Sequence, residues 1–265
     1  MKKISYILFG FALASTLSAQ TVLVNEDFAP DGSESASDNL AGTVPNTSAT
    51  GNPWKTPGPF KPSVAGALTS DDGVADVAIP TLTANTTYEL SLTFDQPFSA
   101  SGGTFPPWVA VGFFNGGPLD KTMPDNSSQS AAWTLVRENG DTRALEGPNT
   151  QNEAQANSST GVAMGSNVQL LSRLTVGSTL TDTTWDAFVT GSDGVQTLFD
   201  LDSGSASTSL TGFDVSNIDH IGFDTTNPNA VVREFNFVAV PEPAHIALLI
   251  GAFAILFAHC RRMRG

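Results

Sequence analysis

Short runs in which apolar and polar residues alternate recur along this chain, and segments rich in Thr, Ser, Gly, Asn and Asp separate them. In the clearest run, residues 88–94, every second side chain is apolar, which is the pattern of a strand with one buried face. Between the two chain ends no segment keeps an apolar period of 3.6 residues over three turns, so the sequence predicts an all-β fold. Besides 88–94, strands are predicted at residues 21–25, 74–79, 108–114, 132–137, 142–145, 168–176, 184–190, 196–201, 220–224 and 231–238.

Two tight turns separate neighbouring predicted strands. Asn139-Gly140 and Asp193-Gly194 both lie between paired runs, and these residue types tolerate the positive φ that two-residue hairpin turns require. In the run before the second turn, Trp185 and its alternate neighbours are apolar, so one face of that strand is predicted to be buried. About ten strands at this spacing favour a sandwich of two packed sheets.

The chain begins with a different pattern. Lys2 and Lys3 precede an apolar run at 4–13 and a stretch of small residues at 14–19. This order is typical of a secretory signal peptide, and cleavage is predicted after Ala19. An uncleaved membrane anchor is the alternative.

The chain ends with Val240, Pro241, Glu242 and Pro243, an almost wholly apolar run at 244–258, then His259 and Cys260, and the basic residues Arg261, Arg262 and Arg264. The prolines disfavour helix for the residues before them, so a helix can begin only after the second proline. From 244 to 260 it would rise roughly 25 Å, close to the ~30 Å hydrocarbon core of a bilayer, with the arginines on the cytoplasmic side. Residues 244–260 are therefore predicted to form a transmembrane helix.

This tail resembles the PEP-CTERM sorting signal of exported bacterial proteins, because the motif, the short transmembrane helix and the basic cluster follow one another at the C-terminus. The resemblance implies that an exosortase, a membrane protease, cuts near the Pro-Glu-Pro motif while the protein is anchored in the inner membrane. It also implies delivery to the cell surface or to an extracellular polysaccharide matrix. A plain tail anchor is the alternative. The predicted organisation is thus a signal peptide at 1–19, an ectodomain at 20–239 and a sorting signal at 240–265.

Charge restricts the partners of the exported part. Residues 20–243 contain seven basic and 26 acidic residues, a formal net charge of −19. Such a surface repels nucleic acid, which is excluded as a partner. The one cysteine, Cys260, lies in the tail, so the ectodomain can form neither a disulfide nor a thiolate metal site.

Several segments of the ectodomain are similar to concanavalin-like or LamG-like jelly-roll domains. They are 25–28, 40–45 with Trp54, 133–137 before the Asn139-Gly140 turn, and 218–224 followed by Glu234 and Phe235. The resemblance implies a two-sheet jelly-roll sandwich, and it supports the fold more than any activity.

The sequence lacks the patterns of triad hydrolases and of jelly-roll glycosidases. A nucleophilic triad needs a histidine base, but His220 is the only histidine between the two membrane segments and no Gly-x-Ser-x-Gly motif occurs. Glycosidases of the jelly-roll fold usually carry a Glu-x-Asp-x-x-Glu strand, which this chain also lacks. The sequence therefore predicts a protein that is not an enzyme, with a degenerate glycoside hydrolase as an alternative.

Two tryptophans are candidates for sugar binding, because exposed aromatic rings stack on the faces of pyranose sugars. Trp54 and Trp108 lie among prolines and glycines in loop-like sequence, as Phe60 does. Trp133 and Trp185, which lie within predicted strands, are assigned to the core. Packing of the two candidates inside the sandwich is the alternative.

No cofactor is predicted, and calcium is the one candidate for a structural ion, because jelly-roll modules often bind it through oxygen ligands in loops. The candidate ligands are Asp71 and Asp72, together with Glu26 and Asp27 near the start of the ectodomain. A solvated turn without a metal is the simpler interpretation.

Together these patterns predict a non-catalytic exported protein, sorted by an exosortase to the cell surface or the polysaccharide matrix. A carbohydrate-binding module that grips glycans through Trp54 and Trp108 is the alternative from a different class. Extracellular polysaccharide is then the expected partner besides the exosortase and the inner membrane.

Overall fold

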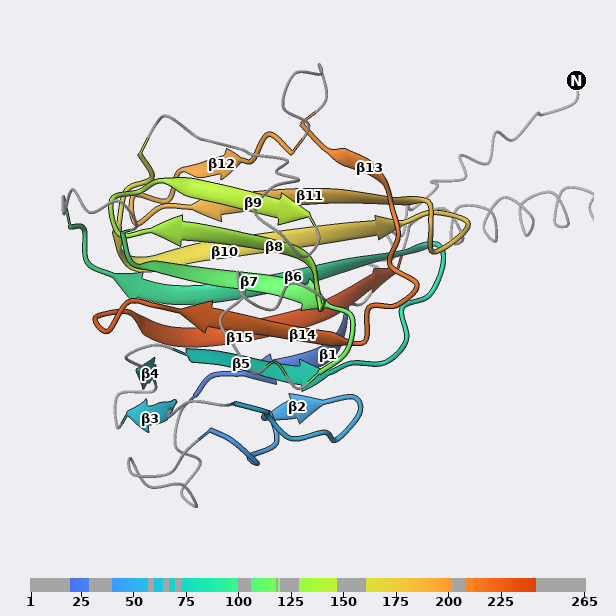
Figure 1. Ribbon diagram of the computed structural model, residues 1–265, viewed down its shortest axis with the longest axis horizontal. Helices are drawn as coiled ribbons and strands as arrows, with labels where there is room; N and C mark the ends of the chain where they lie inside the picture. Colours follow the sequence, from blue (N-terminus) through green and yellow to red (C-terminus); the bar gives the residue numbers. More distant parts are fainter. Residues whose placement is uncertain are drawn as a thin grey trace, which may run out of the picture. The chain divides into compact units, whose positions relative to one another are not determined.

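The described part of the chain is a sandwich of two antiparallel sheets (Figure 1). The computed structural model describes residues 20–28, 40–56, 60–63, 67–69, 73–99, 106–117, 119, 129–146, 161–201 and 208–241. Residues 20–241 group into one compact unit. The predicted all-β, two-sheet architecture is therefore confirmed. The predicted signal peptide at 1–19 and the predicted transmembrane helix at 244–260 lie outside the described residues, within which no helix is long and apolar enough to cross a bilayer.

The larger sheet has ten strands. Its main path runs β12 (Gln196–Leu198), β11 (Thr183–Thr190), β10 (Gly165–Val176), β6 (Thr86–Gln96), β15 (Val231–Pro241), β1 (Thr21–Glu26) and β2 (Thr47–Ser48). Off this path, β13 (Leu210–Phe213) pairs with β11, and β4 (Ala67–Thr69) pairs with both β15 and β3 (Lys61–Ser63).

The smaller sheet has five strands and overlies the larger one in Figure 1. Their order is β5 (Gly73–Ala78), β14 (His220–Thr225), β7 (Trp108–Phe114), β8 (Ser130–Arg137) and β9 (Thr142–Glu146). All the strands predicted from the sequence are present in the two sheets, some longer or shorter by a few residues. The strands that were not predicted, β2, β3, β4 and β13, span two to four residues each, too few for an alternating pattern to show.

Both predicted hairpin turns are confirmed. Asn139-Gly140 joins β8 to β9, and Gly140 has a φ of 83°. Asp193-Gly194 joins β11 to β12, and Gly194 has a φ of 77°. Only glycine adopts such angles without strain, which fixes the register of the two hairpins.

An aromatic cluster fills the core where the N-terminal part of the chain meets both sheets. The Trp54 ring lies 5.2 Å from the Phe235 ring of β15 and 5.6 Å from the Phe223 ring of β14, measured between centroids. Phe60 lies 5.2 Å from Phe223, and both Trp54 and Phe60 are fully buried. Both rings therefore belong to the core, which contradicts the prediction of Trp54 as an exposed sugar-binding ring.

Backbone pairing explains why a proline-rich segment enters the core. The Trp54 amide donates to the Thr43 carbonyl at 2.8 Å, and the Gly42 amide donates to the Trp54 carbonyl at 2.9 Å. Lys55 pairs with Asp76 at the edge of β5. These bonds tie residues 40–56 to the sandwich and turn the Trp54 side chain inward.

The two sheets differ in how their outward faces are buried. Burial alternates along β6, β10 and β11, so the larger sheet presents a polar, partly exposed face to solvent. Nearly every residue of β5, β7, β8 and β14 is buried, so the smaller sheet is covered on both faces. We call the side of the smaller sheet that faces away from the larger one the outer face.

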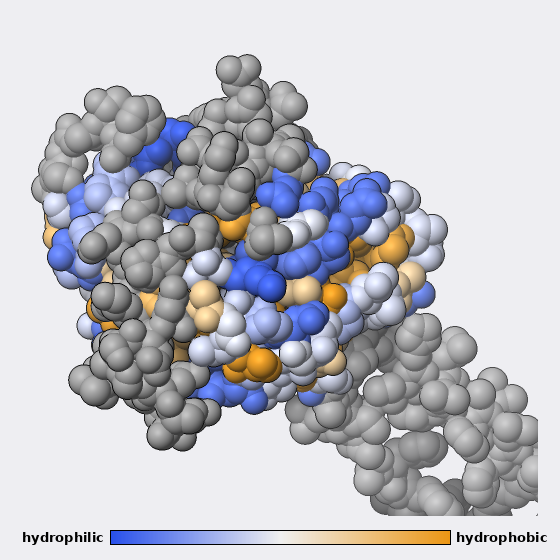
Figure 2. Space-filling model, turned by 60° about the horizontal axis from the view of Figure 1, so that its bottom comes forward, coloured by the Kyte–Doolittle hydropathy of each residue, from blue (hydrophilic) through white to orange (hydrophobic). Residues whose placement is uncertain are grey.

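A second hydrophobic cluster, separate from the main core, lies on this outer face. Its members are Val74, Ala110, Phe114, Leu119, Trp133, Leu135 and Leu145, with Trp108 packed at its margin. Elsewhere, the described surface seen in Figure 2 is mostly hydrophilic, with small and separate hydrophobic areas. The outer face is therefore the one place, among the described residues, where a second apolar layer has formed outside the sandwich.

Candidate functional site

Polar and charged side chains lie at both ends of the outer face. At one end Asp76, Asp219 and His220 meet, and we call this group the histidine end. At the other end Trp108 of β7 pairs with Arg137 of β8, and Arg143 of β9 pairs with Leu135 of β8. We call Trp108, Arg137 and Arg143 the tryptophan end. His220 pairs with Phe114, the last residue of β7, and Trp108 is its first residue, so the length of β7 separates the two ends.

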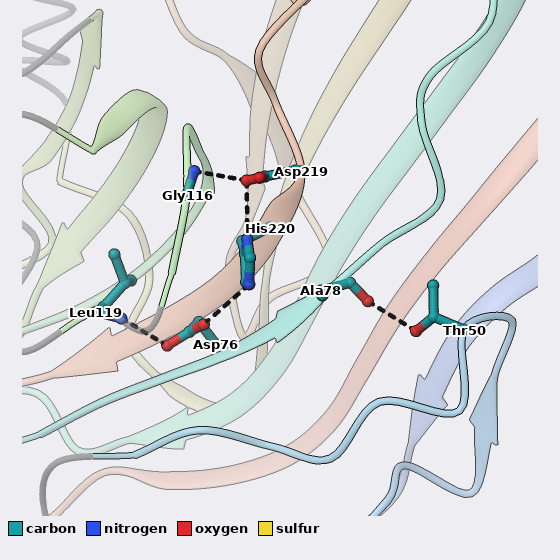
Figure 3. Close-up of polar contacts among 7 residues, drawn as sticks. All are labelled: Thr50, Asp76, Ala78, Gly116, Leu119, Asp219 and His220. Atoms are coloured by element: carbon teal, nitrogen blue, oxygen red, sulfur yellow. Dashed lines mark hydrogen bonds and ion pairs between the residues drawn. The ribbon is translucent and has the colours of Figure 1, made fainter.

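At the histidine end, two carboxylates hold one imidazole between them (Figure 3). His220 Nδ1 lies 2.8 Å from Asp219 Oδ1, and His220 Nε2 lies 3.9 Å from Asp76 Oδ2. The Leu119 amide donates to Asp76 Oδ1 at 2.9 Å, and the Gly116 amide donates to Asp219 Oδ1. The polar group thus anchors the turn that follows β7.

Burial governs the ionisation of this group. Asp76 is fully buried, and burial raises the pKa of its carboxyl from 3.8 to about 6, although the Leu119 amide and His220 act against the shift. A Cβ added at Gly117 would lie 2.6 Å from His220 Nε2 and 2.7 Å from Asp76 Oδ2. The backbone at Gly117 therefore closes directly over the His220–Asp76 pair.

The chemistry open to the histidine end is limited by these contacts. Both ring nitrogens of His220 face carboxylates, and among the described residues neither has a hydroxyl contact. No group of three or more His, Cys, Asp or Glu side chains within the described ranges is arranged to hold a metal ion. The contacts described for His220 are structural, because they link β5, β14 and the turn after β7.

The tryptophan end is more open. Trp108 is half-buried, and its ring centroid lies 6.3 Å from that of Trp133 at an interplanar angle of 46°. The Trp108 amide donates to Thr226 Oγ1 at 3.1 Å, and the Trp108 carbonyl accepts from the Thr226 amide at 3.0 Å. These bonds fix the start of β7, so the position of the ring does not depend on a free loop.

An exposed phenylalanine belongs to a segment that meets the same end. The Ser99 amide donates to the Glu138 carbonyl at 3.1 Å, and the Glu138 amide donates to the Pro107 carbonyl at 2.9 Å. These two bonds join the residues after β6, before β7 and after β8. Phe98, which precedes Ser99, is 61% exposed, the most exposed large hydrophobic residue in the described part of the chain.

Two arginines lie beside the aromatic residues of the tryptophan end. Arg137 and Arg143 alternate with inward-facing residues of β8 and β9, so both side chains belong to the outer face. Burial lowers the pKa of the Arg137 guanidinium, and the charge of Arg143 lowers it further, while Asp141 acts in the opposite direction. The tryptophan end therefore combines aromatic rings with positive charge in an otherwise acidic domain.

The two tryptophans proposed from the sequence have different surroundings. Trp54 is a core residue with no exposed surface, so the structure contradicts its assignment as a ring on which sugar stacks. Trp108 retains a partly exposed ring on the outer face. Trp133 and Trp185 are buried, as predicted. Sequence reasoning missed Phe98 and the arginine pair, although the alternation around the Asn139-Gly140 turn places Arg137 and Arg143 on one face.

The candidate calcium ligands are not brought together as a group in the described part of the chain. The Glu26 carboxylate is buried and accepts a hydrogen bond from the Phe28 amide at 2.8 Å, and burial raises its pKa. The Asp27 amide donates to Asn46 Oδ1 at 3.0 Å. Asp71 and Asp72 lie outside the described residues, so a calcium site that includes them stays a prediction.

The sorting motif is only partly described. Val240 and Pro241 continue β15, where they pair with Thr87 and Thr86 of β6. The last strand therefore runs two residues into the segment assigned to the sorting signal. Glu242, Pro243 and the basic residues Arg261, Arg262 and Arg264 lie outside the described residues.

Comparison with known proteins supports the fold. No protein-family model and no curated protein matches this chain. Among solved structures, it is similar to an endo-1,3-β-glucanase from Streptomyces sioyaensis, with a TM-score of 0.51 and 10% identity over 85% of this chain and 98% of that chain. The chain is thus a jelly-roll sandwich of the kind found in that glucanase, and at this identity the likeness extends to the fold alone.

Two lectins superpose less closely. The carbohydrate recognition domain of Emp46p gives a TM-score of 0.46 at 10% identity, over 69% of this chain and 87% of that chain. Peanut lectin gives 0.45 at 9% identity, over 83% of this chain and 97% of that chain. Neither superposition is close enough to carry an argument about this protein.

Proposed function

We propose that this chain is a non-catalytic, exported carbohydrate-binding protein whose sugar site is the tryptophan end of the outer face. The observation that carries the proposal is the partly exposed ring of Trp108, fixed at the start of β7, with the exposed Phe98 on a segment bonded to the same end. Aromatic rings held by a rigid scaffold stack on pyranose faces, and neighbouring polar groups orient the sugar hydroxyls.

The carboxylates of the outer face favour binding over hydrolysis. Glycoside hydrolysis needs two carboxyl groups that flank the scissile bond. Asp76 and Asp224 lie on the outer face, but both are fully buried. Asp76 also accepts a hydrogen bond from the Leu119 amide at the opposite end from Trp108. A sugar seated on Trp108 would therefore meet no exposed carboxylate pair contributed by these two residues.

The chain termini supply the second part of the proposal. The signal peptide at 1–19 and the PEP-CTERM-like tail at 240–265 would deliver the sandwich across the inner membrane, and an exosortase would release it to the cell surface or the polysaccharide matrix. A protein retained in a polysaccharide layer gains from a sugar-binding face, so sorting and binding support one role.

Binding is tested with the purified full-length protein in detergent, by glycan array and then by isothermal titration calorimetry on the best ligand. We expect Trp108→Ala and Phe98→Ala each to weaken binding tenfold or more, which corresponds to about 1.4 kcal/mol. The matched control is Phe188→Ala, which removes a half-buried ring from the solvent face of the larger sheet. No binding to any glycan, or equal loss in all three variants, would refute the proposed site.

Sorting and the absence of catalysis have their own tests. Mass spectrometry of the protein recovered from cells should show an N-terminus near Gln20 and a C-terminus near the Pro-Glu-Pro motif. A mature surface form that still ends at Gly265 would contradict sorting. Incubation with the bound polysaccharide should release no new reducing ends, and turnover would instead support the glycosidase alternative.

A further inference from the structure

The chain enters and leaves the sandwich at the same end. Its first strand, β1, lies antiparallel to its last strand, β15, and Thr21 at the start of β1 pairs with Ala239 near the end of β15. Pro241, the last residue of β15, pairs with Thr86, the first residue of β6. Both connections to the predicted membrane segments therefore start from one end of the larger sheet.

Two segments rich in threonine form the surface at this end. Residues 80–87 lead into β6, and residues 177–184 run from the end of β10 into β11. The Asn85 amide donates to the Gly177 carbonyl at 2.9 Å, which joins the two segments. Together they contain eight threonines and one charged residue, Asp182, so most of the polar groups there are hydroxyls. We call these two segments the threonine end.

The tryptophan end lies at the other end of the sandwich. Val231 at the start of β15 pairs with Asp95 near the end of β6, so β15 runs from that end to the threonine end. The Trp108 amide donates to Thr226 Oγ1 at 3.1 Å, in the connection between β14 and the start of β15. Figure 1 shows that β7 begins and β15 ends at opposite ends of the sandwich. Because β15 has 11 residues and a strand rises about 3.3 Å per residue, roughly 33 Å separates the two ends.

Little chain separates the sandwich from the predicted membrane helix at 244–260. Glu242 and Pro243 are the two residues between the end of β15 and that helix. Because consecutive Cα atoms are 3.8 Å apart, the chain reaches at most about 11 Å from Pro241 to the start of the helix. The headgroup layer of a bilayer is itself about 6 Å thick on each side. An anchored chain therefore cannot move the end of β15 far from the headgroups.

We propose that the anchored chain is a tether, which holds its threonine end against the lipid headgroups and presents its tryptophan end to polysaccharide away from the bilayer. The short connection after β15 sets this orientation. The tether rests on the proposed function, and it makes the sugar site of that function usable before an exosortase releases the protein. If the chain left the sandwich beside Trp108 instead, the sugar site would face the lipid.

Attraction between charges does not explain this orientation. The Val215 amide donates to the Leu180 carbonyl at 2.9 Å, which brings residues 214–219 beside the threonine end. These residues and the threonine end contain acidic residues but no Lys or Arg, so anionic lipid would repel this surface. Threonine hydroxyls can donate hydrogen bonds to phosphate oxygens, so a zwitterionic headgroup is the better partner.

The orientation is tested by fluorescence quenching in phosphatidylcholine vesicles whose headgroups carry a nitroxide. The full-length chain with Cys260→Ser receives a single thiol for a dye, through either Thr181→Cys or Val195→Cys. Both positions are exposed, the first at the threonine end and the second in the turn after β11, at the opposite end of the larger sheet. We expect the dye at 181 to be quenched severalfold more strongly than the dye at 195. Equal quenching, or stronger quenching at 195, would overturn the proposal.

A longer connection is the matched control. A flexible insertion of about twenty Gly and Ser residues between Pro241 and Glu242 has a mean end-to-end distance of roughly 25 Å. Quenching at 181 should then fall toward that at 195. Unchanged quenching would show that the short connection does not set the orientation, against the proposal.

Sugar binding distinguishes failure of the tether from failure of the proposed function. Soluble 1,3-β-glucan, xylan and polygalacturonate are titrated against the full-length chain in detergent and in vesicles. A polysaccharide that binds in detergent should bind equally well in vesicles, and Trp108→Ala should abolish both. Binding in detergent that is lost in vesicles would overturn the tether and leave the sugar site intact.

Two further outcomes would also overturn the tether. If none of the three polysaccharides binds in detergent, the tether has no cargo, and a negative glycan array would then refute the proposed function as well. If the full-length chain does not float with the vesicles in a density gradient, residues 244–260 are not an anchor, although sugar binding in solution would stand.

Discussion

The outward faces of the two sheets differ in how far their side chains are buried and in how their charged groups are paired. On the larger sheet the outward side chains are polar and partly exposed, and its arginines are paired with Glu89 and Asp95. On the smaller sheet the outward side chains are mostly buried, with an apolar cluster between a buried Asp–His group and an arginine pair. Solvation satisfies the first face, whereas the second depends on additional packing.

This difference indicates which of the two outward faces gains more from binding a ligand. A face that already contacts water gains little from a ligand that replaces the water. A covered face with aromatic rings at its margin gains apolar contact when a ligand binds. The outer face of the smaller sheet is therefore the better candidate surface, and the predictions below test whether the two faces differ as described.

The largest effect is expected for removal of a ring from the outer-face cluster. Trp133 is 3% exposed, so Trp133→Ala should lower the free energy of unfolding by about 3–5 kcal/mol, as for core residues. Phe188 is half-buried on the solvent face and lies beneath the Arg173 guanidinium, so Phe188→Ala should cost only about 1 kcal/mol. Urea unfolding followed by tryptophan fluorescence and circular dichroism measures both values. Equal losses would mean that the outer face is not a second core.

The next effect is a pH dependence of opposite sign on the two faces. Burial raises the pKa of Asp76 from 3.8 to about 6, so the folded state binds its proton more tightly than the unfolded state. Stability should therefore fall as the pH rises from about 4 to 6, by up to roughly 3 kcal/mol at 1.36 kcal/mol per unit. Asp95 behaves oppositely, because hydrogen bonding to Arg233 lowers its pKa and the stability it contributes is lost as the pH falls.

Denaturant melts between about pH 2 and 7 separate these two contributions, because the pKa of Asp95 lies below 3.8 and its contribution is lost mostly below that pH. The Asp76→Asn variant keeps an acceptor for the Leu119 amide but cannot ionise, so its stability should lack the decline between pH 4 and 6. Asp95→Asn should instead reduce the loss of stability at low pH. A wild-type profile that Asp76→Asn leaves unchanged would show that this carboxyl is not the buried acid described here.

Much of the fold could be predicted because local alternation determines which side of a strand is buried. The pattern in β6 and β11 placed Tyr88, Leu92 and Trp185 in the core, and all three are buried. The position of Trp54 could not be predicted in the same way. Its surroundings are proline-rich, and its burial depends on pairing with Thr43 and on the bridge between Lys55 and Asp76, contacts that no local pattern reveals.

The candidate site was predictable only in part. Trp108 was found because an aromatic residue among prolines suggests a surface ring. The burial of the outer face was not predicted, because an apolar run such as 108–114 is compatible with a strand that is buried on one side or on both sides. The arginine pair was missed, although Arg137 and Arg143 flank the Asn139-Gly140 turn at spacings that hairpin register brings to one face.

A smaller effect is expected from crowding at the centre of the outer face. A Cβ added at Gly112 would lie 2.5 Å from the Trp133 Cβ and 2.9 Å from the Ala132 carbonyl oxygen, and neither atom can move far in a central strand. Gly112→Ala should cost about 1–3 kcal/mol. Gly161→Ala is the matched control, because its nearest neighbour would be 3.6 Å away and its stability should be nearly unchanged. A tolerated Gly112→Ala would mean that β7 and β8 approach less closely than the structure shows.

The smallest effect is expected from removing single arginine charges, Arg173 beside Glu89 and Arg137 beside Arg143. Arg173→Gln breaks an ion pair with Glu89 that is partly exposed, so it should reduce stability by about 0.5 kcal/mol, and less at high salt. Arg137→Gln removes one of two like charges, so it should leave stability unchanged or raise it slightly, and 1 M salt should narrow the difference between the variants. This contrast is measurable in paired urea melts of the unliganded protein. If Arg137→Gln is instead as destabilising as Arg173→Gln, then the Arg137 charge has a stabilising partner within the fold that outweighs the repulsion from Arg143.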